Sequence, residues 1–173
     1  QFRNLATIGG SIFGRYGFSD VLTVFLAMDS YVELHKGGII PLHEFAQMKR
    51  DNDILVRVIV KKDQKDFVYL SHRNSKTDFP VLTCAVSVDE TEGWISVGAR
   101  PQKAVRMSMT EEVRKKVEQG VCSEEEMKKE AEDISAQIKT DSNMRAGKEY
   151  RSHLAKVLIR RSLERLNAKG GDQ

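Results

Sequence analysis

The stretch that most constrains the fold is Phe79–Val88, which reads FPVLTCAVSV and contains no charged residue. A short apolar run of this kind is typical of a strand buried on both faces. Three further runs have strand character, and the turn-like Glu90–Gly93 precedes the last of them: Ile54–Val60, Phe67–Ser71 and Trp94–Gly98. We therefore expect an antiparallel meander of three to four strands, with Phe79–Val88 at its centre.

From about Thr110 onward the pattern becomes helical. Either Ser108 or Thr110 can cap a first helix, and Ser123 followed by three glutamates favours the start of a second. The expected helices are Glu111–Gln119, ended by Gly120, then Ser123 to Ile138, and Lys148–Leu166. The last should pack across the sheet through a stripe made of Ala155, Ile159, Ser162, Leu163 and Leu166.

The first part of the chain carries two adjacent glycines, Gly9 and Gly10, between the hydroxyls of Thr7 and Ser11. Adjacent glycines let the backbone approach a ligand closely, and the amides of such a turn can bind an anion. Ser19-Asp20 then opens an apolar helix expected to reach about residue 28. These residues alone fit either a ligand-cradling loop with a carboxylate or a tight turn before an ordinary helix cap. Without a further motif the second interpretation is favoured.

A domain boundary is expected where the chain becomes polar. Tyr31–His35 alternates apolar and polar residues, as a half-buried strand does, and a short helix is expected over His43–Met48. Lys49–Asn52 then forms a polar break. We therefore divide the chain into residues 1–52 and 53–173, and expect an α+β fold in which about three helices gather on one face of the meander.

Composition excludes several classes of function. The net charge is only +3 although 31% of the residues are charged, so acidic and basic residues are interspersed. The sequence therefore shows no basic face of the kind that binds nucleic acid. No apolar run is long enough to cross a bilayer, and no signal-peptide pattern is found. Cys84 and Cys122 lack the spacing of a zinc ribbon, a redox motif or an iron–sulfur site; Cys84 should be buried, whereas Cys122 should be exposed. The chain is expected to be cytoplasmic.

The sequence offers no catalytic or metal-ligating set. No Ser-His-Asp or Cys-His arrangement has usable spacing, and the histidines are scattered over the chain at His35, His43, His72 and His153. The chain starts at Gln1 without an initiator methionine, and the glycine pair follows almost at once. We therefore expect a fragment that lacks an N-terminal lobe.

The segment Arg3–Ile12, RNLATIGGSI, followed by Ser19-Asp20, resembles the second flavin-binding segment of the molybdenum hydroxylases. These are the FAD-carrying medium subunits or domains of xanthine dehydrogenase and carbon monoxide dehydrogenase type enzymes. Further segments resemble the same family in the same order: Asp53–Val56, Tyr69–Phe79, Ile95–Ala99, Gly147–Arg151, His153-Leu154 and Val157–Arg161. The resemblance covers nearly the whole chain. It implies that residues 1–52 are the C-terminal part of the FAD-binding domain and that 53–173 resemble the carbon monoxide dehydrogenase flavoprotein C-terminal domain.

The resemblance also implies an FAD site. Its cofactor-binding residues would be Thr7, Ile8, Gly9, Gly10, Ser11, Ser19, Asp20 and Leu55, with Asp20 accepting hydrogen bonds from the cofactor and Leu55 near the isoalloxazine edge. Ser11 departs from the family's usual Asn, and Ser71 or Leu70 stands where many members have a flavin-facing Lys. Because the family's other phosphate loop precedes anything in this sequence, FAD should bind weakly or not at all to these residues alone.

The implied function is electron transfer. A molybdopterin-binding large subunit would oxidise the substrate, and electrons would pass through an iron–sulfur small subunit to FAD and on to NAD or another acceptor. No partnership with nucleic acid or membrane is implied. The alternative is a non-catalytic interaction or scaffold module that keeps the fold and has lost the flavin.

Overall fold

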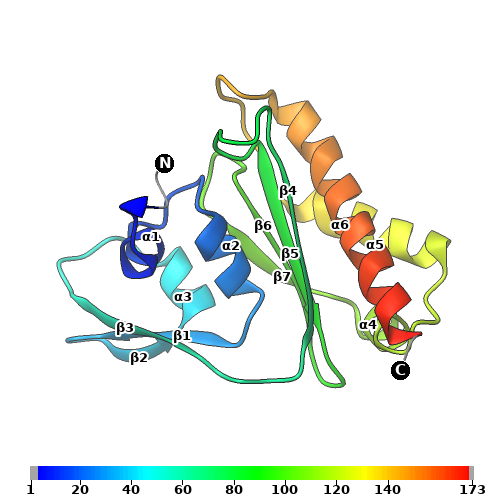
Figure 1. The fold of residues 1–173 in the computed structure, drawn as a ribbon, viewed down its shortest axis with the longest axis horizontal. Helices are drawn as coiled ribbons and strands as arrows, with labels where there is room; N and C mark the ends of the chain where they lie inside the picture. Colours follow the sequence, from blue (N-terminus) through cyan, green and yellow to red (C-terminus); the bar gives the residue numbers. More distant parts are fainter. Residues whose placement is uncertain (1–3, 172–173) are drawn as a thin grey trace.

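The computed structural model describes residues 4–171, which form two antiparallel sheets and six helices (Figure 1). In chain order the elements are α1 (Ile8–Gly14), α2 (Asp20–Leu26), β1 (Ser30–Leu34), β2 (Gly38–Pro41), α3 (Leu42–Gln47), β3 (Leu55–Val60), β4 (Asp66–His72), β5 (Leu82–Val88), β6 (Gly93–Gly98), β7 (Val105–Ser108), α4 (Glu111–Glu118), α5 (Glu124–Gln137) and α6 (Lys148–Gly170).

The first sheet has the strand order β2-β1-β3. Strand β1 alternates buried and half-buried residues, as the sequence predicts, and Gly38 turns the chain into β2 with a φ of 69°. One face of this sheet and helices α1–α3 enclose a core that includes Leu22, Leu26, Val32 and Phe45. The first part of the chain therefore has a hydrophobic core of its own.

The second sheet is a meander in the order β4-β5-β6-β7. Every residue of β5 is buried, which confirms the predicted central strand, and β5 and β6 are joined as a hairpin through Val88 and Gly93. The expected α+β meander of up to four strands is therefore confirmed. Strand β7, which follows Pro101 and is only four residues long, escaped prediction.

Strand β3 does not belong to this meander, contrary to expectation. It pairs with β1, with Val58 opposite Val32. Several of its residues stay exposed, a pattern that suits an edge strand with one covered face better than a meander strand under helices. The predicted boundary after residue 52 remains a prediction, and this pairing favours a boundary within 61–65.

Helices α4, α5 and α6 cover one face of the second sheet (Figure 1). The predicted stripe on α6 is buried as expected, but the helix continues to Gly170. The lack of a side chain at Gly170 allows this, because the helix here passes close to the end of α4. A Cβ at this position would lie 2.4 Å from the Glu118 carbonyl oxygen.

The predicted exposure of Cys122 is wrong. This residue is 5% exposed, because the Asn167 side chain on α6 accepts from its backbone nitrogen at 2.9 Å and donates to its carbonyl oxygen at 3.2 Å. Cys84 is fully buried in β5, as predicted.

Helix α2 packs on the opposite face of the second sheet and joins the two parts of the chain. The hydroxyls of Thr23 on α2 and Thr83 on β5 lie 2.9 Å apart, and the Ser87 hydroxyl donates to the Ala27 carbonyl oxygen. Gly98 on β6 permits this approach, since a Cβ there would lie 2.0 Å from Thr23 Oγ1. The second sheet is thus covered by helices on both faces.

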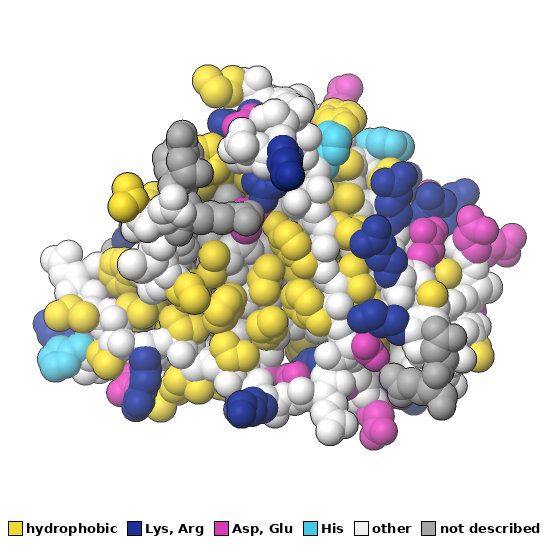
Figure 2. Space-filling model, viewed as in Figure 1, with side chains coloured by type: hydrophobic (Ala, Val, Ile, Leu, Met, Phe, Trp, Pro, Cys, Tyr) yellow, Lys and Arg dark blue, Asp and Glu magenta, His cyan; other side chains and the backbone are white. Residues whose placement is uncertain are grey.

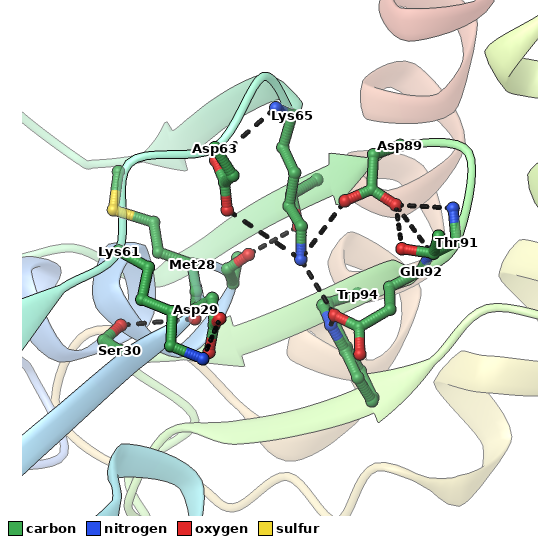
Figure 3. A network of polar contacts seen from close by, with 12 residues as sticks. Met28, Asp29, Ser30, Lys61, Asp63, Lys65, Asp89, Thr91, Glu92 and Trp94 are labelled. Atoms are coloured by element: carbon green, nitrogen blue, oxygen red, sulfur yellow. Dashed lines mark hydrogen bonds and ion pairs between the residues drawn. The ribbon is translucent and has the colours of Figure 1, made fainter.

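A polar network also fixes the connection between the two sheets (Figure 3). Lys65, whose side chain is 7% exposed, reaches Glu92 at 2.9 Å and Asp89 at 3.5 Å on the β5–β6 hairpin. Hydrogen bonds from Thr91 and the Glu92 amide lower the pKa of Asp89 in spite of its partial burial. Beside it, Lys61 pairs with Asp29 at 3.0 Å. The connecting segment is therefore anchored at both ends.

Candidate functional site

The glycine pair forms the first turn of helix α1, and neither of the two interpretations of the sequence, a ligand-cradling loop or a tight turn, included this helix. Thr7 is the N-cap, and its hydroxyl accepts from the Gly10 amide at 3.0 Å. Neither Gly9 nor Gly10 takes a positive φ. A Cβ at Gly10 would lie 3.0 Å from Thr7 Oγ1, so the absence of a side chain permits the tight cap. Arg3, the first residue of the family-like segment, lies outside the described residues.

Ser19-Asp20 begins helix α2, as predicted. The Ser19 hydroxyl accepts from the Leu22 amide at 3.1 Å, and Asp20 is the first helical residue, where a carboxylate is favoured by the helix dipole. Its carboxylate accepts from the Tyr69 hydroxyl at 2.7 Å and from Arg73 Nη2, which lies 2.7 Å from both oxygens. The carboxylate therefore faces strand β4 across the junction of the two parts of the chain.

A pocket of about 460 Å³ lies at this junction. It is lined by residues from the start of the chain, α1, α2, β4 and the segment before β5, namely Ala6, Thr7, Ile8, Ser11, Tyr16, Phe18, Ser19, Asp20, Val21, Val24, Phe25, Tyr69 and Phe79. Figure 2 shows that hydrophobic side chains gather over α2 and between α2 and the four-stranded sheet. The pocket is thus mostly apolar, with a few hydroxyls and one carboxylate.

The structure brings most of the predicted site residues together in this pocket: Thr7, Ile8, Ser11, Ser19 and Asp20. The remaining three, Gly9, Gly10 and Leu55, do not line it. A Cβ at Gly9 would lie 3.7 Å from the Leu55 side chain, and Leu55 packs against the core of the first sheet. Gly10 lies beneath the Thr7 cap.

Sequence reasoning points to Tyr16 as an aromatic residue near the glycine pair, but it missed Phe18 and Phe79. Tyr16 and Phe18, 47% and 46% exposed, have nearly parallel rings with centroids 5.3 Å apart. Phe18 in turn contacts Phe79, with a centroid distance of 4.5 Å. The one sequence signal for Phe79 is the family-like segment Tyr69–Phe79, of which it is the last residue.

Hydrogen bonds and ion pairs link the charged and phenolic groups beside the pocket. Burial and the Asp20 carboxylate raise the pKa of the Tyr69 phenol, so the phenol stays a donor at neutral pH. Arg145 pairs with Asp78 at 3.0 Å and lies over the Phe79 ring at 5.2 Å. The hydrogen bonds from Arg145 and from the Phe79 amide lower the pKa of Asp78.

These residues fit a flavin. Exposed, stacked aromatic rings and aliphatic side chains suit a flat ring system, while the hydroxyls of Thr7, Ser11 and Ser19 suit polyol and phosphate oxygens. Within residues 4–171, no group of three or more His, Cys, Asp or Glu side chains could hold a metal ion. Over the same range, no helix is both long and apolar enough to span a membrane.

Two family models match consecutive parts of the chain. Residues 1–62 match the FAD binding domain in molybdopterin dehydrogenase, and residues 67–166 match the CO dehydrogenase flavoprotein C-terminal domain. No curated protein gave a significant match.

Solved structures share the fold. Quinoline 2-oxidoreductase from Pseudomonas putida 86 aligns with a TM-score of 0.79 and 16% identity, over 98% of this chain and 63% of that chain. Reconstituted CO dehydrogenase from Oligotropha carboxidovorans aligns with a TM-score of 0.77 and 19% identity, over 97% of this chain and 63% of that chain. The CO dehydrogenase from Hydrogenophaga pseudoflava that lacks the Mo-pyranopterin moiety aligns with a TM-score of 0.75 and 18% identity, over 93% of this chain and 60% of that chain.

At these identities the structural likeness establishes the fold, and the chain spans 60 to 63% of the length of these relatives. The two consecutive family matches establish more. The chain belongs to the FAD-binding flavoprotein subunits of the molybdenum hydroxylase family.

Proposed function

We propose that this chain is part of the FAD-carrying electron-transfer component of a molybdopterin-dependent hydroxylase or dehydrogenase of the xanthine dehydrogenase type. The observation that carries the proposal is the convergence of Thr7, Ser11, Ser19 and Asp20 on one aromatic-walled pocket. The chemistry that FAD supplies when bound is the passage of electrons from iron–sulfur clusters to NAD or another acceptor.

The side chains of this chain would bind and orient the cofactor. The hydroxyls of Thr7 and Ser11 would meet its polar oxygens, Asp20 would accept hydrogen bonds beside Ser19, and Ile8 would add an apolar contact. Gly9 and Gly10 would let the backbone of α1 come close, with Leu55 supporting them from behind. No side chain is assigned a role as an acid, a base or a nucleophile.

The proposed partners are a molybdopterin-binding large subunit and an iron–sulfur small subunit, because solved relatives are molybdenum enzymes. We place this electron transfer in the cytoplasm. The free thiols of Cys84 and Cys122 are in keeping with a reducing compartment.

A second candidate function is a scaffold module of the same fold without flavin. One observation favours it: the Asp20 carboxylate is already engaged by Tyr69 and Arg73 within the chain. The absence of the family's flavin-facing Lys, where Ser71 or Leu70 stands, also favours it. The intact flavin-binding segment opposes it, because Thr7, Ser11 and Ser19 still gather in one pocket.

The absorbance spectrum of the full-length gene product separates the two functions. We expect flavin bands after purification or after reconstitution with FAD, and their absence in both cases would exclude the first function. For the 173 residues alone we expect no stable complex, because they span about three fifths of the relatives' length. Micromolar binding in a calorimetric titration with FAD would contradict this expectation. Neighbouring genes for a molybdopterin subunit and an iron–sulfur subunit would support the proposed partners.

A further inference from the structure

We propose that Arg73 is a positioning residue of the flavin pocket, which orients the Asp20 carboxylate and balances its charge from the second half of the chain. The inference rests on the proposed function, because it assigns Asp20 to a pocket wall that faces FAD. It adds a residue that lies outside the flavin-binding segment.

The contact between Arg73 and Asp20 is close and partly desolvated. Arg73 Nη2 lies 2.7 Å from both carboxylate oxygens, and the two side chains are 18% and 29% exposed. The Tyr69 hydroxyl adds a third hydrogen bond at 2.7 Å. Both charge-assisted bonds come from the one Nη2 atom, and together with the Tyr69 bond to one of the oxygens they fix the rotation of the carboxylate. Although burial lowers it, the bond to Asp20 leaves the pKa of Arg73 raised, so the guanidinium stays charged.

The same guanidinium connects two walls of the pocket. Arg73 Nη1 donates to the Asp78 carbonyl oxygen at 2.7 Å, and the next residue, Phe79, lines the pocket. The Asp78 carboxylate is held by Arg145 and by the Phe79 amide at 2.7 Å. Arg73 therefore sets the distance between the carboxylate on α2 and the aromatic ring before β5.

Two arginines that are buried elsewhere in the described chain have a different role. Arg100 donates to the carbonyl oxygen of Lys103 and Arg151 to that of Val81, so these guanidinium groups satisfy backbone groups. Arg73 instead neutralises a carboxylate in the pocket wall. Without it, an unbalanced negative charge would stand beside the bound cofactor and disfavour the addition of electrons.

The test compares Arg73→Met, Arg73→Lys and the control Arg160→Met in the full-length flavoprotein. Arg160 is also half-buried and ion-paired, but it lies on α6 with Glu124 and Glu164 as its partners. Two readouts are needed, FAD affinity by fluorescence titration and the midpoint potential of the bound flavin.

We expect Arg73→Met to weaken FAD binding on the order of tenfold and to make the potential more negative, as loss of a partly buried ion-pair partner implies. Arg73→Lys should keep the potential near that of the unmodified protein and recover only part of the affinity, because one ammonium cannot hold both the Asp20 carboxylate and the Asp78 carbonyl oxygen as the two guanidinium nitrogens do. Arg160→Met should change neither quantity.

Unchanged affinity and potential in Arg73→Met would overturn the inference while leaving the proposed function intact. A full-length protein that binds no FAD even before substitution would instead remove the proposed function, and the inference with it. If Arg73→Met does not fold, Arg73→Lys decides: affinity equal to that of the unmodified protein would overturn the positioning role. In a double-mutant cycle, Asp20→Asn should add little to the loss caused by Arg73→Met if the two residues act as one unit.

Discussion

The contact between α2 and the second sheet can be tested by adding a single methyl group at Gly98. A Cβ at this position would lie 2.0 Å from Thr23 Oγ1, 2.7 Å from Thr83 Oγ1 and 3.3 Å from the Ala104 Cβ. Both threonines are fully buried, and their hydroxyls bond each other at 2.9 Å. The added methyl group cannot be accommodated unless α2 moves away from β6.

The magnitude follows from two contributions. Overpacking of a dense core costs roughly 1–3 kcal/mol, and a broken buried hydrogen bond adds about 1 kcal/mol. We therefore expect Gly98→Ala to lower the free energy of unfolding by about 2–4 kcal/mol, which for a chain of this size lowers Tm by roughly 5–15 °C. Urea titration monitored by the fluorescence of Trp94, the one tryptophan, and by circular dichroism measures the loss.

Two further variants test whether the loss of stability comes from the clash at Gly98. Gly147→Ala is the matched control, because nothing lies within 4 Å of a Cβ there. Gly147 is the N-cap of α6, a position where Ala is less favourable than Gly, so the free energy of unfolding should fall by less than about 1 kcal/mol. Thr23→Ala removes the clashing oxygen, so the loss in the double variant with Gly98→Ala should be smaller than the sum of the two single losses. A Gly98→Ala protein as stable as the unmodified one would refute the packing argument.

Three further predictions concern other buried groups. Arg151→Met should lower the free energy of unfolding by about 2–4 kcal/mol, because its fully buried guanidinium donates to several carbonyl oxygens. It should also speed proteolysis of the loop before α6. An unchanged urea midpoint would contradict this prediction. Lys65→Met should be destabilising at neutral pH, and the difference from the unmodified protein should shrink as pH falls. The carboxyl pKa values of Asp89 and Glu92 are lowered in the folded state, so their contribution is present above the unfolded pKa near 4 and lost as pH falls through the folded values; a difference independent of pH would count against the network. Burial raises the pKa of the Cys84 thiol to about 12, so a thiol reagent should label it only at the rate of global unfolding, and rapid labelling of the native protein would disprove its burial.

Local sequence patterns predicted most elements because their signals are short-range. The capping box at Ser123, the all-apolar β5 and the alternation in β1 each reflect contacts that the residue types alone favour. The partner of β3 could not be predicted in this way, because strand propensity does not say which neighbour a strand will pair with. The glycine pair was misread for a similar reason: with Thr7 as a cap, two glycines can also begin a helix.

The site shows the same limit. Asp20 could be found from its place after Ser19, but its partners Tyr69 and Arg73 lie 49 and 53 residues further along the chain. Nothing in the spacing of a β-strand indicates which of its side chains will face a carboxylate on a distant helix. The pairing becomes visible only once α2 is packed on the second sheet.

That packing has a consequence for how the proposed flavin site is assembled. The match to the FAD-binding domain ends at residue 62, yet Tyr69 and Phe79 of the second half line the same pocket as Thr7 and Asp20. The junction that positions them is the close approach of Thr23 to Gly98, so a change there should alter FAD binding as well as stability. Gly98→Ala in the full-length flavoprotein should therefore weaken FAD binding even under conditions where the protein remains fully folded. If the affinity is unchanged while stability falls, the pocket is held by the first half alone, and the contribution that we assign to the second half is wrong.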